Sequence, residues 1–121
     1  MPHEWAKGIF LCELGDEPEL SEDIAALFER LRAMPGDGTP HVVLNFEGVS
    51  YLNSSHIASL LRLRKRLGEG RKQLVLAALG DDVWSVLLLT GLDKVFQVAP
   101  DTATALARVQ IELPGGPGFD A

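Results

Sequence analysis

Residues 41–70 read HVVLNFEGVSYLNSSHIASLLRLRKRLGEG, and this stretch decides the fold class. Its first part carries an unbroken Val-Val-Leu run at 42–44, which is typical of a strand covered on both faces. Its last part places apolar residues at helical spacing from Ile57 to Leu67, with bases on the other side. The stretch therefore predicts a strand, a polar loop and an amphipathic helix that is stopped by Gly68 and Gly70.

The same alternation of strand and helix patterns continues along the chain. Further apolar runs predict strands at 9–14, 74–79 and 95–98. Apolar residues at helical spacing predict helices that start near Ser21, near Asp81 and after Thr102. Strands that alternate with helices over short connections require crossovers, so we expect an α/β fold with a mainly parallel, mixed β-sheet covered by α-helices.

The length of 121 residues and the 46% of hydrophobic residues are sufficient for one domain with its own core. We expect this domain to span residues 1–112. The Gly/Pro-rich residues 113–121 cannot hold a regular element and are predicted to be a flexible tail.

The charge of the chain limits its partners. A formal net charge of −6 disfavours nucleic acids and anionic membranes as partners. Residues 62–72 are an exception, with six bases and one acid, and we interpret this basic run as the solvated end of a helix. The sequence contains no apolar run of ~20 residues that would span a membrane. We therefore predict neither nucleic-acid nor membrane binding.

Cysteine usage and the start of the chain bear on location. Cys12 is the single cysteine, so no disulfide can form within the chain and a reducing compartment is expected. The first residues do not resemble a signal peptide. The sequence therefore predicts a cytoplasmic protein.

The polar residues Asn53, Ser54, Ser55 and His56 lie where the strand that ends near Val49 turns into the helix that begins near Ile57. In α/β sheets, ligands and partners commonly meet the fold at this end of the strands. One interpretation is a helix cap, because Asn and Ser side chains accept bonds from the free amides of a first turn. The other is a phosphoacceptor site, because the helix dipole stabilises an added phosphate by roughly 0.3–2 kcal/mol. Both interpretations stay open at this point.

An ordered set of segments resembles the STAS domains, the family of anti-sigma factor antagonists and sulfate transporter tails. The resemblance spans residues 9–110 and lies in the strand at 42–46, the loop at 49–57, the strand at 74–76, and residues 90–96 and 105–106. In that family the second hydroxyl residue of the loop accepts phosphate from a kinase-type anti-sigma factor. By position, the resemblance implies that Ser55 is the phosphorylated residue.

The resemblance also implies a partner cycle and a surface for it. The unphosphorylated antagonist binds its anti-sigma factor kinase, phosphate on the serine weakens that binding, and a phosphatase restores it. The implied partner-binding residues are Asn53, Ser54, Ser55, His56, Ser59 and Arg62. No cofactor and no metal ligands are expected.

Three positions depart from the family pattern. Asn45 and Asn53 stand where the family usually has aspartates, and His56 stands where it has glycine. These departures favour an alternative in which the chain is a non-switching scaffold or a companion subunit of a transporter. Residues 15–18 also leave little room for the second strand common in the family. For His56 itself, a partly exposed surface residue is expected, or else a protonated ring that pairs with phosphate on Ser55.

The residues give little support to an enzyme. Ser55 and His56 are neighbours in a helical turn and do not face each other, so they make a poor nucleophile and base. The histidines and Cys12 lack metal-ligand spacing. Trp84 and residues 87–89 are predicted to be core.

Overall fold

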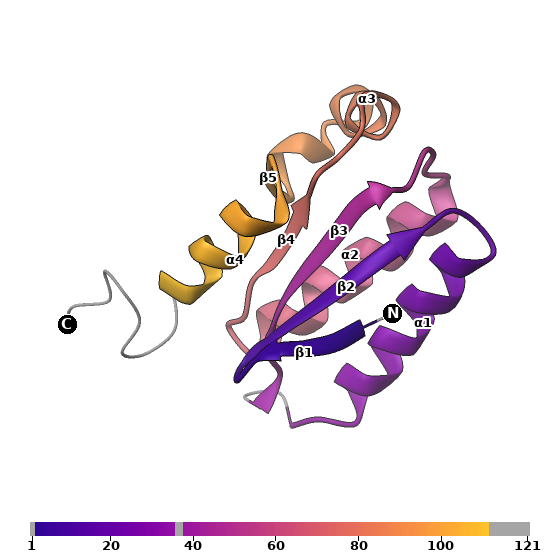
Figure 1. Ribbon diagram of the computed structural model, residues 1–121. Helices are drawn as coiled ribbons and strands as arrows, with labels where there is room; N and C mark the ends of the chain where they lie inside the picture. Colours follow the sequence, from indigo (N-terminus) through magenta and orange to yellow (C-terminus); the bar gives the residue numbers. More distant parts are fainter. Residues whose placement is uncertain (1, 36–37, 112–121) are drawn as a thin grey trace.

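The computed structural model of the chain describes residues 2–35 and 38–111, so the predicted tail at 113–121 lies outside it. The strands of this part are β1 (Pro2–Ala6), β2 (Ile9–Gly15), β3 (His41–Gly48), β4 (Leu74–Ala77) and β5 (Gln97–Ala99). The helices are α1 (Glu19–Arg32), α2 (Ser54–Glu69), α3 (Asp81–Thr90), the short 3-10 helix η2 (Leu92–Lys94) and α4 (Thr102–Ile111) (Figure 1).

The strands form one mixed sheet in the order β1-β2-β3-β4-β5, which is also their order in the sequence. The β1–β2 pair is antiparallel, and each later pair is parallel. The central strand β3 pairs Val43 with Leu11 on one side and with Val75 on the other. This register buries the run at 42–44 on both faces, and the predicted α/β fold with a mainly parallel sheet is confirmed.

Strand β1 is the element that the sequence analysis missed. It lies before β2 and pairs with it as a hairpin. The second strand considered from the sequence would lie after β2, where residues 15–18 leave little room for one. Gly8 has a φ of 84° in the connection, a conformation that glycine adopts without strain. Because β1 carries mostly exposed polar and aromatic side chains, its residues do not show the apolar pattern of a buried strand.

Two apolar clusters lie on the two faces of the sheet. Helices α1 and α2 lie side by side on one face of the sheet (Figure 1). The larger cluster contains their buried side chains, such as Leu27 and Leu63, together with Phe46 of β3. In the smaller one, Ala105 and Val109 of α4 pack against the other face of β3 and β4. Helices α1, α2 and α4 therefore each bury one stripe against the sheet, as expected for a layered α/β domain, whereas α3 packs mainly with η2.

Some predicted boundaries and burials were wrong. Helix α1 begins at Glu19, before the predicted start at Ser21, so that Ser21 lies within the first turn and donates its amide and hydroxyl back to the Glu17 carboxylate. Strand β5 begins only at Gln97, since Val95 and Phe96 form the turn after η2, with backbone N–H groups that donate to the carbonyl of Leu92. Leu88 and Leu89 are exposed, although Leu87 beside them is buried as predicted.

The basic run is more than a solvated helix end. Arg64 Nε donates to the carbonyl of Val95 at 3.1 Å, and Lys72 Nζ donates to the carbonyl of Thr39 at 2.6 Å. Arg66 Nη2 reaches two carbonyls at the end of α1, which are described further below. These cations therefore hydrogen-bond α2 and its C-terminal turn to other parts of the domain. The prediction that the basic run is only a solvated helix end was wrong.

The length and hydropathy of the helices in the described residues show whether any of them could span a membrane. None of them is both long and apolar enough to cross a bilayer.

Candidate functional site

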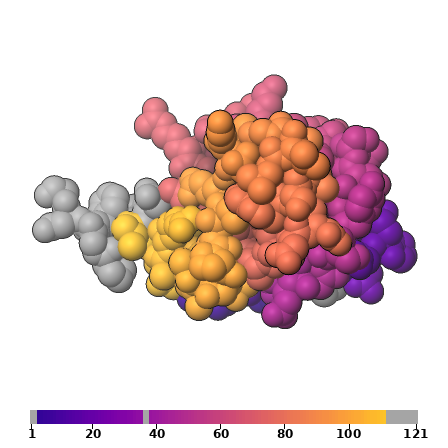
Figure 2. All heavy atoms as spheres, turned by 90° about the horizontal axis from the view of Figure 1, so that it is seen from above, coloured from indigo at the N-terminus to yellow at the C-terminus, as the bar shows by residue number. Residues whose placement is uncertain are grey.

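Three connections meet at the carboxyl end of the parallel strands. Figure 2 looks onto this end, with the β2–α1 connection in indigo, the β3–α2 connection in magenta and helix α3 in orange, from one side to the other. The candidate site occupies the first two connections and the helices that follow them.

The first turn of α2 is held by a reciprocal cap. Asn53 precedes the helix, and its Oδ1 accepts the backbone N–H of His56 at 2.9 Å. In return, Nδ1 of His56 accepts the backbone N–H of Asn53 at 3.1 Å. Two free donors of the helix start are thereby satisfied. The capping interpretation is confirmed for Asn53, and the helix starts at Ser54 instead of near Ile57.

His56 is buried, with 4% of its surface exposed, so the expectation of a surface residue was wrong. Its Nδ1 is used in the cap, and its Nε2 lies 3.4 Å from Oε1 of Glu17. With Nδ1 accepting a bond, the ring proton of a neutral histidine belongs on Nε2, facing that carboxylate. Both ring nitrogens therefore have partners inside the domain, and the ring joins the starts of α1 and α2.

Glu17 is fixed in turn by the first turn of α1. Its two carboxylate oxygens accept the backbone N–H and the hydroxyl of Ser21, each at 2.7 Å. These hydrogen bonds, that of the hydroxyl above all, hold the pKa of Glu17 below its usual value. The carboxylate is therefore charged at neutral pH where it meets the His56 ring.

Asp16 holds the connection that leads into α2. Its Oδ1 accepts the backbone N–H of Ser50 and its Oδ2 accepts the hydroxyl of the same residue, each at 2.8 Å. The bond from the Ser50 backbone, followed by that from its hydroxyl, lowers the pKa of Asp16. The two residues are 34 positions apart in the chain, so no local pattern could have revealed this contact.

Replacing Asp16 by asparagine is expected to destabilise the domain at neutral pH, because an amide group cannot accept both bonds from Ser50. The pKa of Asp16 in the folded chain lies below the ordinary pKa of an aspartate, so the stabilisation by Asp16 is fully present above that ordinary pKa. It is lost as the pH falls through the folded pKa. Urea unfolding at pH 7 and pH 3 should show the difference between variant and wild type shrinking at pH 3.

Glu47→Gln removes another exposed carboxylate near the end of β3 and controls for net charge in that experiment. An Asp16→Asn variant as stable as the wild type at pH 7 would contradict a holding role for Asp16.

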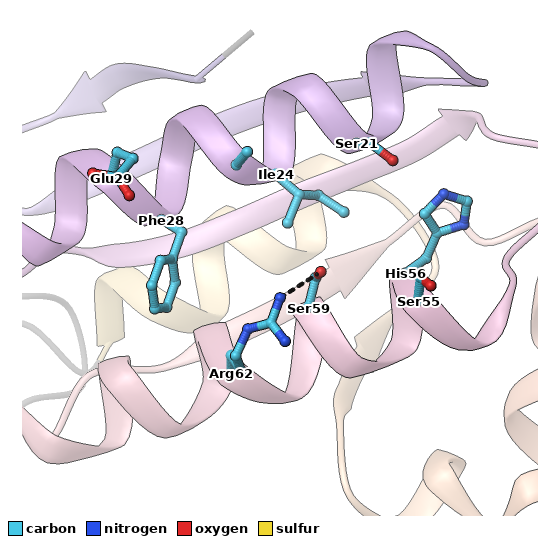
Figure 3. Close-up of a pocket in the computed structure, with 9 residues that line it drawn as sticks. Ser21, Ile24, Phe28, Glu29, Ser55, His56, Ser59 and Arg62 are labelled. Carbon is cyan, nitrogen blue, oxygen red and sulfur yellow. Dashed lines mark hydrogen bonds between the residues drawn. The ribbon is translucent and has the colours of Figure 1, made fainter.

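The two serines of the loop lie on different sides of α2. Both are exposed, but Ser55 lines a groove between α1 and α2, whereas Ser54 is absent from its lining. Ser55, Ser59 and Arg62 follow one another at helical spacing and share one face of α2, as Figure 3 shows. Nη2 of Arg62 donates to the Ser59 hydroxyl at 3.1 Å.

The groove is about 230 Å³ in volume and has walls of different character. The α1 wall is largely apolar, with Ile24, Ala25 and Phe28, and carries Ser21 and Glu29 at its rim (Figure 3). The α2 wall presents hydroxyls, the edge of the His56 ring and the Arg62 guanidinium. A groove of this kind accepts an apolar side chain with polar groups beside it.

The predicted site residues are thus divided by the structure. Ser55, His56, Ser59 and Arg62 come together along the groove. Asn53 serves as the cap and Ser54 lies outside the lining. The α1 wall went unnoticed in the sequence, because its residues match the ordinary pattern of an amphipathic helix.

Cys12 and Asn45, two residues singled out in the sequence, are not among the residues that line the groove. Burial raises the pKa of the Cys12 thiol to about 11, so little of it is ionised and reactive at neutral pH. Asn45 bonds locally, its Oδ1 accepting the backbone N–H of Glu47 at 3.0 Å. Among residues 2–35 and 38–111, no group of three or more His, Cys, Asp or Glu side chains could hold a metal ion.

Comparisons with known proteins identify the family of the chain. The family model described as STAS domain matches residues 16–105. An anti-sigma-B factor antagonist from Staphylococcus aureus is 29% identical over 79 residues, which cover 65% of this chain and 73% of that protein.

Solved structures confirm the fold. The anti-sigma factor antagonist SpoIIAA of Bacillus, in its unphosphorylated form, superposes with a TM-score of 0.74 at 16% identity, covering 94% of this chain and 98% of that one. An anti-sigma-factor antagonist (STAS) domain protein from Planctomyces limnophilus gives a TM-score of 0.70 at 19% identity, covering 88% of this chain and 95% of that one.

Proposed function

This chain belongs to the STAS domain family, and on that premise we propose that it binds a kinase-type anti-sigma factor and is switched by phosphorylation of Ser55. In this proposal the chain is a regulatory binding module and the partner performs the catalysis. A phosphatase would reverse the modification. A cytoplasmic location, expected from the sequence, is part of the same proposal.

One observation supports the proposal above the others, namely the position of the Ser55 side chain. It is exposed on the first turn of α2 and lines the groove, so a kinase can approach its hydroxyl while it docks on the groove. In the transfer, Oγ of Ser55 attacks the γ-phosphorus of ATP, the new O–P bond replaces the bond to ADP, and the serine proton is released. The added group carries about −1.5 to −2 charges at neutral pH.

The surroundings of Ser55 explain how modification would change binding. The groove offers apolar side chains on α1 and hydroxyls on α2 to a partner that carries no phosphate. A phosphate placed at Ser55 adds bulk and charge to one wall of this groove. We expect a partner side chain that fits the groove to be displaced, in keeping with the cycle proposed here.

The test combines the purified chain with the candidate anti-sigma factor kinases of its organism and with ATP. Intact-mass analysis should show one addition of about 80 Da, the mass of one phosphoryl group. Ser55→Ala should abolish the addition. Ser54→Ala, which removes the neighbouring hydroxyl outside the groove, should leave it unchanged.

Two results would count against the proposal. One is the absence of the addition with kinases that phosphorylate their other substrates in the same assay. The other is partner capture that does not change when Ser55 is replaced by aspartate, which favours a non-switching module.

A further inference from the structure

We propose that Ser59 and Arg62 bind the phosphate on Ser55, so that the modified chain fills its own α1–α2 groove. The inference rests on the proposed function in one respect, namely that Ser55 is the residue that is modified. The inference adds a phosphate-binding site within the same chain, formed by residues of the next two turns of α2.

The spacing of the three residues brings them into reach of one another. Ser59 is four positions after Ser55, so their side chains are neighbours on the helix surface, about 5–6 Å apart at Cβ. Arg62 follows three positions later, and side chains of a helix lean toward its N-terminus. The guanidinium accordingly reaches back to the Ser59 hydroxyl at 3.1 Å, one turn away from Ser55 (Figure 3).

A phosphate on Ser55 extends into the space that this guanidinium borders. The groove holds about 230 Å³, which is room for a phosphate, and all three residues line it. Arginine is well suited to this contact because its planar fork donates two parallel bonds to phosphate oxygens. The Ser59 hydroxyl can donate a third bond, since it now accepts one from Arg62.

Other charged groups around the groove come from α1 and from the preceding connection. Glu29 lines the α1 wall, and its Oε1 accepts a bond from Nη1 of Arg32 at 3.1 Å. On the side of Ser55, Glu17 faces the His56 ring and bonds to Ser21. Both carboxylates oppose a second negative charge, so Arg62 is the lining residue that supplies a fixed positive charge to the phosphate.

The expected consequence is an exchange of occupants. In the unmodified chain the groove is open to a partner side chain, with Arg62 bonded to Ser59. In the modified chain the phosphate turns Arg62 and Ser59 toward Ser55 and occupies the same space. Phosphorylation would then weaken partner binding by filling the groove, in addition to any repulsion by its charge.

The test uses the full chain with phosphoserine incorporated at position 55 during synthesis, so that no kinase is required. A titration followed by ³¹P NMR gives the second pKa of the phosphate, which is near 6 for an ordinary phosphoserine. A nearby cation stabilises the dianion, so Arg62→Gln should raise this pKa by about 0.5–1 unit. Arg62→Lys keeps the charge but loses the fork, and should give a smaller rise.

Lys65→Gln is the matched control. It removes one positive charge from the same helix, but Lys65 lines a different hollow with Arg64 and Gly68. Its effect on the phosphate pKa should stay within about 0.2 unit, because exposed charges farther apart are screened. Ser59→Ala should raise the pKa less than Arg62→Gln does.

A rise after Arg62→Gln no larger than that after Lys65→Gln would overturn the inference. That outcome leaves the kinase assay on Ser55 unaffected. Conversely, a chain that no kinase modifies but whose synthetic phosphate shows the Arg62 effect would contradict the proposed function alone.

Discussion

Replacing Phe46 by alanine is expected to lower the free energy of unfolding by about 3–5 kcal/mol, the largest effect of any change considered for this chain. Phe46 is fully buried at 0% exposure and is among the largest side chains in the core. It lies near the end of β3 and packs in the cluster that also contains Val49 and Leu52 of the following connection. Its removal would leave a cavity in this cluster.

Urea unfolding followed by circular dichroism measures this loss as a lower midpoint at an unchanged slope. Tyr51→Ala provides the control, because it removes an aromatic ring of similar size that is 61% exposed, and should change stability by about 0.5 kcal/mol or less. Should Phe46→Ala fail to fold, Phe46→Leu leaves a smaller cavity and should give an intermediate value. Equal midpoints for Phe46→Ala and Tyr51→Ala would contradict the packing described for β3.

Replacing Arg66 by alanine is expected to cost about 1.5–3 kcal/mol, the usual range for hydrogen bonds made by a charged group. Nη2 of Arg66 donates to the carbonyls of Leu31 at 3.2 Å and Met34 at 2.6 Å. These carbonyls lie at the end of α1 and just after it, where the backbone acceptors of a helix are not all paired within it, although that of Leu31 also accepts the backbone N–H of Met34 at 3.2 Å. Arg66 therefore fixes the end of α1 against α2 and, with it, the width of the groove between them.

Two measurements separate this role from a general loss of charge. Hydrogen exchange of the amides in the last turn of α1 should become faster in Arg66→Ala, together with a lower urea midpoint. Arg32→Ala is the control, because Arg32 is exposed and pairs with Glu29 at 3.1 Å, an ion pair expected to contribute about 0.5 kcal/mol. Equal urea midpoints and equal exchange rates for Arg66→Ala and Arg32→Ala would contradict a stabilising role for the hydrogen bonds from Arg66 to α1.

Much of the fold could be predicted because it follows from local patterns. The Val-Val-Leu run at 42–44 and the leucine stripe that ends at Leu67 each specify one element, and their alternation specifies the crossovers. Strand β1 could not be found in this way, since an edge strand has little buried surface to impose an apolar pattern. The prediction that Leu89 is part of the core was wrong for the opposite reason. An apolar residue in a helix can still face solvent, and Leu89 is 87% exposed.

In the candidate site, too, only the features that follow from local spacing could be predicted. One wall of the groove was predictable, because helical periodicity alone places Ser55, Ser59 and Arg62 on one face. The other wall depends on how α1 packs against α2, which no local spacing encodes. The burial of His56 and the contact of its ring with Glu17 were equally hidden, since Glu17 belongs to a different connection.

The match between strand order in the sheet and strand order in the sequence has a consequence for how the chain acquires its structure. Each parallel strand pairs with the strand synthesised just before it, so no position must be kept vacant for a later segment. Contacts between segments close in sequence form quickly, because little chain entropy is lost in closing short loops. We therefore expect a nascent chain to assemble its sheet stepwise from β2 onward as it leaves the ribosome.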